Sequence, residues 1–238
     1  MNTLDLEKDY KDRVLEVWNK FKDIPVLNDN ECEYRKSPLL PKTVKKNAIL
    51  FIGINPAFSK NRKQEIINKE IEFYPFISDD EADIIYFKKF KEIASYCNNS
   101  EWTHLDLFFL RETNQEVIER LCHGKYIDFL QEQLEITFEI INRIDPKIIV
   151  VSNSLGSEFF GKKKQKHLVE FSDRKIWKGY NLDFEKDFNK EIGTYTIRIG
   201  EKETPIIFSG MLSGQRALDL GSLERLKWQI KMILDSQL

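Results

Sequence analysis

The sequence has few cysteines, glycines and prolines, and it contains no long apolar run. Its three cysteines, Cys32, Cys97 and Cys122, stand far apart, which argues against a disulfide framework or a structural zinc site and predicts reduced thiols in a cytoplasmic protein. The longest apolar run, residues 48–54, is much shorter than the roughly 20 residues of a membrane span. The first ten residues are largely polar, so we expect no secretory signal and no contact with a membrane.

An excess of charge of one sign is also missing. The chain has 37 Lys and Arg against 39 Asp and Glu, a formal net charge of −2. Because proteins that bind DNA through its phosphates are usually basic, a nucleic-acid partner must be recognised by local patches. Residues 162–178 hold seven basic and two acidic residues, and Lys60, Arg62 and Lys63 form a second cluster. Either cluster by itself is typical of a solvated loop.

Apolar residues are abundant, at 41% of the chain, and predict one folded domain over residues 1–238. Apolar spacing predicts an N-terminal helix over 4–22, within an N-terminal helix and connector that occupy residues 1–44. Further helices are predicted at 78–97, 115–121, 126–144 and 222–234, and strands at 48–54, 104–110, 147–152, 194–199 and 205–209. Residues 161–193 are predicted to be an irregular, mobile insertion. Strands alternating with helices predict an α/β fold, a three-layer α/β/α sandwich with a mainly parallel four-stranded central sheet.

Ligands of such sheets bind beyond the carboxyl ends of the strands, which directs attention to the residues that follow the first buried strand. Gly53 permits close approach of a ligand to the backbone, and Asn55 offers amide donors and an acceptor. Pro56 stiffens the turn, and Phe58 offers a flat aromatic face. The same residues also describe a buried strand that simply ends in an Asn-Pro turn.

Several well-known signatures are absent from the sequence. There is no Gly-x-Gly-x-x-Gly, no Walker-type loop, no His-Glu-x-x-His and no Gly-x-Ser-x-Gly. The three histidines, His104, His123 and His167, have no partner at metal-binding spacing, and none is assigned a role. We therefore expect neither a cofactor nor a metal.

Gly53-Ile-Asn55-Pro56 resembles the first motif of the uracil-DNA glycosylase superfamily, nearest to its mismatch-specific and single-strand-selective branches. Residues 104–111 lie where that family has a strand carrying a base-recognising polar residue, and residues 146–152 resemble its third strand. Residues 208–213 lie where its second catalytic motif would stand. The resemblance spans residues 45–235 and implies a uracil-DNA-glycosylase-like fold. It also implies a hydrolase that acts on single- or double-stranded DNA. We expect the protein to be a monomer.

The resemblance implies a role for each matching residue. Asn55 is the catalytic residue, and it orients a water rather than taking a proton, because an amide is not a base at neutral pH. The base-binding residues are Gly53, Ile54, Pro56, Ala57, Phe58 and Asp106, and the nucleic-acid-binding residues are Ser59, Lys60, Arg62, Ser209, Gly210, Met211, Leu212, Ser213, Gln215 and Arg216. Met211 and Leu212 are candidate apolar wedges.

Two positions depart from a simple match to the family. A carboxylate at Asp106 accepts hydrogen bonds only and does not reproduce the donor and acceptor pair that uracil prefers, and it equally suits a capping or ion-paired carboxylate near Arg111. Phe208 stands where the second motif begins with a polar residue. The resemblance implies cleavage of the N-glycosidic bond of a flipped uracil or other damaged base. The alternatives are a non-catalytic nucleotide- or nucleic-acid-binding module and a protein-interaction domain.

Overall fold

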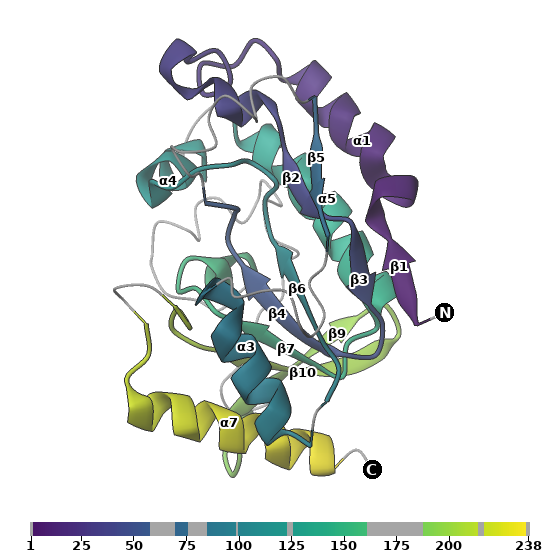
Figure 1. Ribbon diagram of the computed structural model, residues 1–238, viewed down its shortest axis with the longest axis vertical. Coiled ribbons are helices and arrows are strands. Elements are labelled where there is room, and N and C mark those ends of the chain that lie inside the picture. Colours follow the sequence, from purple (N-terminus) through teal and green to yellow (C-terminus); the bar gives the residue numbers. More distant parts are fainter. Residues whose placement is uncertain are drawn as a thin grey trace.

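A mixed six-stranded sheet lies at the centre of the protein, in the spatial order β6-β4-β7-β10-β9-β8 (Figure 1). The computed structural model describes residues 2–57, 70–75, 85–98, 100–122, 126–160, 188–213 and 217–236. The strands of this sheet are β4 (Ile49–Gly53), β6 (Trp102–Asp106), β7 (Ile148–Val151), β8 (Phe188–Asn189), β9 (Thr194–Ile199) and β10 (Lys202–Phe208). Every residue of β4, β6 and β7 is buried, which explains why these strands appear as short, nearly continuous apolar runs.

Strand direction divides the sheet into two parts. β4 pairs in parallel with both β6 and β7, and β7 pairs in parallel with β10. β9 pairs antiparallel with both β10 and β8, and the hairpin between β9 and β10 turns at Gly200, whose φ of 63° favours glycine. The prediction of an α/β fold is therefore confirmed. The prediction of four strands is wrong, because antiparallel pairing adds two strands to the four parallel ones.

Helices cover both faces of the sheet (Figure 1). On one face, α1 (Leu6–Lys20), α4 (Gln115–Cys122) and α5 (Ile127–Ile144) share a core with Leu50 and Ile52 of β4. On the other face, α3 (Ile85–Tyr96) and α7 (Leu220–Asp235) pack with Ile49 and Phe51 of the same strand. Alternate residues of one strand thus supply both cores, because successive side chains point to opposite faces.

The helix ends follow local chemistry. Asp5 caps α1 by accepting from the amide of Lys8 at 3.0 Å, and Asp219 caps α7 by accepting from the amide of Ser222 at 3.0 Å. α5 ends at Asp145, which adopts a left-handed conformation with a φ of 49°. The helix predicted from residue 78 is described only from Ile85 onward. No helix in the described ranges is long and apolar enough to cross a membrane.

Two sequence predictions need correction. The connector contains a 3₁₀ helix, η1 (Asn30–Lys36), and two short strands, β2 (Leu39–Pro41) and β3 (Thr43–Lys45). β2 pairs with β5 (Glu72–Tyr74), and β3 pairs with β1 (Thr3–Asp5). The strand expected over 104–110 ends at Asp106, and residues beyond it continue as a buried non-strand segment. Of the insertion predicted over 161–193, only 188–193 is described, and it includes β8. A second 3₁₀ helix, η3 (Gly156–Phe160), follows β7.

Candidate functional site at the ends of strands β4 and β6

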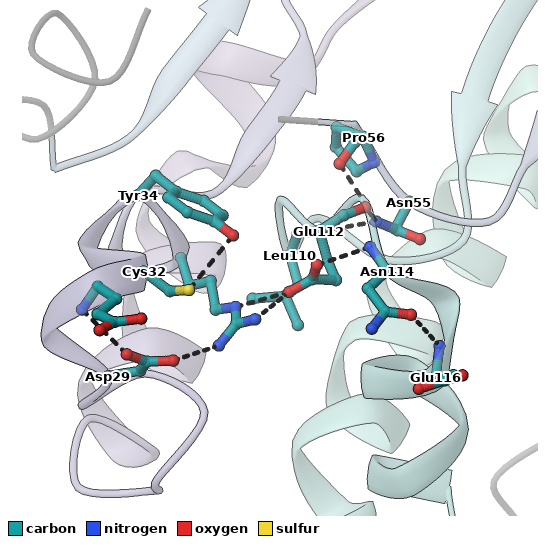
Figure 2. A network of polar contacts seen from close by, with 11 residues as sticks. Asp29, Cys32, Tyr34, Asn55, Pro56, Leu110, Glu112, Asn114 and Glu116 are labelled. Atoms are coloured by element: carbon teal, nitrogen blue, oxygen red, sulfur yellow. Dashed lines mark hydrogen bonds and ion pairs between the residues drawn. The ribbon is translucent and has the colours of Figure 1, made fainter. Parts of the chain in front are cut away.

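Asn55 lies just beyond the carboxyl end of β4 and is half-buried. Its Nδ2 donates to three backbone carbonyls, those of Glu112 at 2.6 Å, Pro56 at 3.2 Å and Leu110 at 3.3 Å (Figure 2). The side-chain oxygen points away from these carbonyls, and no described residue donates a hydrogen bond to it. The amide is therefore fixed by its nitrogen, and its oxygen is left as an acceptor.

The carbonyls held by Asn55 belong to residues 107–112, the buried segment that follows β6. Amides of this segment donate to three carbonyls of residues 53–56 at 2.9–3.1 Å. Two side chains of α5 complete the set: Gln133 accepts from an amide of the segment at 2.9 Å, and Thr137 donates to one of its carbonyls at 2.8 Å. Asn55 is thus one of three described side chains that satisfy buried backbone groups of a segment that is not itself a strand.

Glu112 also forms a buried ion pair with Arg35 of η1. Arg35 Nε donates to Glu112 Oε2 at 2.7 Å, Nη2 binds the same oxygen, and the two side chains are only 9% and 3% exposed. Asp29 accepts from Arg35 at 3.2 Å, and the second oxygen of Glu112 accepts from the amide of Asn114 at 2.7 Å (Figure 2). This network fastens η1 to the same segment that Asn55 holds.

Asp106 is the last residue of β6 and lies opposite Gly53 of β4 in the parallel register. It is 9% exposed, and no described residue donates a hydrogen bond to its carboxyl. A Cβ at Gly53 would clash with Asp106 Oδ1, so the glycine is required by this close approach. Arg111, the cation that the sequence suggested as a partner, instead donates to Glu72 at 2.6 Å. His104 Nε2 lies 3.7 Å from Asp106 Oδ1.

Two tyrosines hold the ring of His104. The hydroxyl of Tyr74 lies 3.4 Å from Nδ1, and the hydroxyl of Tyr86 lies 3.3 Å from Nε2. The ring of Phe90 stacks on the imidazole at 5.5 Å. Burial lowers the pKa of His104 to about 3 and raises the pKa of Asp106 to about 7, because water no longer solvates the charged forms. Both groups are therefore uncharged between about pH 3 and pH 7.

The remaining residues predicted to bind a base lie on the turn after β4. Ile54 and Pro56 are buried, and their carbonyls accept hydrogen bonds from amides of residues 107–112. Ala57 is exposed. Phe58 lies outside the described residues, so its predicted contact with a base stays a prediction.

The segment after β10 lies at the same edge of the sheet as Asn55. Ser209 Oγ donates to the carbonyl of Gly210 at 2.9 Å, and Met211 is half-buried. Leu212 is 5% exposed and packs into the core with α7, so its side chain is not placed as an exposed wedge. Ser213 is half-buried.

Several residues predicted to bind nucleic acid lie outside the part of the chain that the structure describes. They are Ser59, Lys60, Arg62, Gln215 and Arg216. The basic residues of 162–178 lie outside it as well. Their roles stay predictions.

Sequence reasoning missed the partners that shape the site. Arg35 and Glu112 come from a connector and a loop, and Tyr86 comes from a distant helix, so no local pattern marks them. One signal was present for His104. The period of two in a strand places it on the same face of β6 as Asp106.

Comparison with protein-family models gives no match, and neither does comparison with curated proteins. Within the described ranges, no group of three or more His, Cys, Asp or Glu side chains is placed to hold a metal ion. The arrangement has two chemical capabilities. The oxygen of Asn55 can accept a hydrogen bond from a water, and the carboxyl of Asp106 can accept hydrogen bonds from a ligand.

Proposed function

We propose that the protein is a DNA glycosylase-like hydrolase that cleaves the N-glycosidic bond of a flipped uracil or other damaged base. The observation that carries this proposal is the orientation of Asn55, whose nitrogen is held by three carbonyls while its oxygen is left as an acceptor. The resemblance of residues 53–56 to the first glycosylase motif supports it. The α/β architecture, the general class of fold that this resemblance implies, is consistent with it.

The chemistry requires little more than positioning. Cleavage of a glycosidic bond passes through an oxocarbenium-like transition state, so a water must be held beside the sugar carbon while the base departs. The bond from the sugar carbon to the base nitrogen breaks with its electron pair left on the base, and the oxygen of the water bonds to the sugar carbon. The amide oxygen of Asn55 accepts a hydrogen bond from that water without taking its proton, and the proton that the water loses ends on the departed base. A nucleotide rotated out of the stack would bring its base edge to Asp106, which ends the neighbouring strand.

A specific observation favours a second candidate, a non-catalytic module that binds the same base. Phe208 occupies the position at which the resembled motif has a polar residue. Its ring packs against Phe160 at 6.3 Å and Tyr195 at 5.7 Å between centroids. An aromatic hydrocarbon in this position donates no hydrogen bond to a departing base, so this stabilisation of the leaving group is missing.

The test is cleavage of oligonucleotides that contain uracil, mispaired thymine or hypoxanthine, with abasic sites scored after alkali treatment. We expect the wild type to cleave at least one of them. We expect Asn55→Ala to lose about a hundredfold or more in rate, because the water is no longer oriented.

Because Asn55 also fastens residues 107–112, the experiment needs a matched control. Thr137→Val removes another hydrogen bond to the same segment, so we expect it to lower the free energy of unfolding by about 1–3 kcal/mol and to retain cleavage. Equal cleavage by the wild type and Asn55→Ala contradicts the catalytic role, as does an equal loss in Thr137→Val. DNA binding by a wild type that cleaves nothing favours the binding module.

A further inference from the structure

The carboxyl of Asp106 is largely buried and has no donor among the residues that the structure describes. Its residue is 9% exposed, its side chain retains 12% of its surface, and no described residue donates to it. A carboxylate that is largely removed from water is usually hydrogen-bonded or paired with a cation, and the remaining exposure of Asp106 lets a partner from outside reach its oxygens. A binding site that is completed by its ligand is one reason for such a carboxyl.

Among the described residues, no cation is paired with Asp106. The basic group near the carboxyl is His104, whose two ring nitrogens are engaged by tyrosine hydroxyls and which burial keeps neutral. Arg111 is engaged by Glu72. Any positive or hydrogen-bonding counterpart of an ionised Asp106 must therefore come from outside the described part of the chain.

The chemistry of a carboxylate restricts what that counterpart is. An ionised carboxylate offers two acceptor oxygens and no donor, whereas the lactam edge of uracil or hypoxanthine offers one N–H and one carbonyl. The carbonyl of a lactam would face a carboxylate oxygen without a hydrogen between them. An edge that satisfies both oxygens has two neighbouring N–H groups.

We infer that the ionised carboxylate of Asp106 binds a base edge with two adjacent N–H donors, such as the ring N–H and exocyclic amine of guanine, so that in this state the site accepts a guanine-type base in preference to uracil. The inference rests on the proposed function for the presence of a base at this edge of the sheet. The close approach of Gly53 to Oδ1 fixes the position of the carboxyl, because a side chain at residue 53 would occupy the place of this oxygen.

The experiment titrates the full-length protein with deoxyguanosine, deoxyinosine and deoxyuridine. Binding of each nucleoside is measured from NMR chemical-shift changes above pH 7, where Asp106 is ionised. Deoxyinosine is the matched probe, since it differs from deoxyguanosine only by the exocyclic amine. We expect deoxyguanosine to bind about tenfold or more tightly than either of the other nucleosides. In Asp106→Asn the amide presents one donor and one acceptor, so we expect the preference to reverse toward deoxyinosine and deoxyuridine.

The comparison of nucleosides on the wild type needs no variant and stands if Asp106→Asn fails to fold. Equal affinities, a preference of the wild type for deoxyuridine, or no saturable binding of deoxyguanosine overturns the inference. Binding is measured here without cleavage, so the two proposals fail separately. Cleavage of uracil-containing DNA without a deoxyguanosine preference overturns only this inference, and deoxyguanosine binding without any cleavage overturns only the hydrolase.

Discussion

The buried neighbours His104 and Asp106 are expected to make opposite contributions to the pH dependence of stability. The pKa of His104 falls from 6.5 to about 3 on folding, so the unfolded chain binds this proton more readily than the folded chain. The contribution of His104 to the free energy of unfolding is therefore present above pH 6.5 and is lost as the pH falls toward 3. The pKa of Asp106 rises from 3.8 to about 7 on folding, so the folded chain retains this proton. Its contribution is present below pH 3.8 and is lost as the pH rises toward 7.

The two contributions have similar size and overlap in pH. Each pKa unit is worth about 1.4 kcal/mol, so each group alone changes the free energy of unfolding by about 3 kcal/mol between pH 4 and pH 6.5, in opposite directions. In the wild type these changes cancel. Asp106→Asn leaves only the histidine contribution, and we expect stability to rise by about 3 kcal/mol over this range relative to the wild type. His104→Gln leaves only the carboxyl contribution, and we expect a fall of the same size.

The measurement is urea unfolding of the wild type and both variants at several pH values between 4 and 6.5, the interval set by the two pKa values. The difference between each variant and the wild type removes the contribution of all other titrating groups. If His104 and Asp106 instead formed an ion pair, the pKa of the histidine would be raised and that of the carboxyl lowered. The two differences would then exchange signs, and the assignment of two neutral groups would be refuted.

Two further predictions concern packing at the site. Gly53→Ala is expected to lower the free energy of unfolding by about 1–3 kcal/mol, because the new Cβ would clash with Asp106 Oδ1. Chemical denaturation measures this loss. The loss should be smaller when Asp106→Ser is added, because the clashing oxygen is then removed. Arg35→Met is expected to cost about 3–5 kcal/mol, because Glu112 is left buried without its cation. Addition of Glu112→Leu should recover part of that loss, and a double variant less stable than either single variant would contradict the account.

The central strands could be predicted because a strand buried on both faces consists of a short, continuous run of apolar residues. Residues 48–54 and 147–152 contain β4 and β7, and the alternating pattern at 194–199 coincides with β9. The end of β6 could not be predicted, because the apolar run continues past Asp106 into a buried segment that is not a strand. That segment is held by side chains more than twenty residues away along the chain, such as Gln133, and local periodicity carries no trace of such contacts.

The candidate site was predictable only where the residues at the end of a strand differ visibly from the apolar residues beside them. Gly53 and Asn55 stand out beside a proline after a buried strand, and Asp106 stands out as a carboxylate within an apolar run. The ion pair of Arg35 with Glu112 joins residues 77 positions apart, so its existence depends on the fold and not on spacing.

The structure also separates two reasons for an amide at position 55. Three carbonyl oxygens surround Nδ2, so folding alone requires a donor there, and an aspartate would place a carboxylate against three acceptors. A loss of cleavage in any Asn55 variant therefore has two physical sources, loosening of residues 107–112 and loss of an acceptor for water. Thr137→Val loosens the same segment from α5 and leaves that acceptor in place. The loss of cleavage in Asn55→Ala alone therefore does not report the chemical role of the oxygen. That role is measured by the difference in cleavage between Asn55→Ala and Thr137→Val at equal loss of stability.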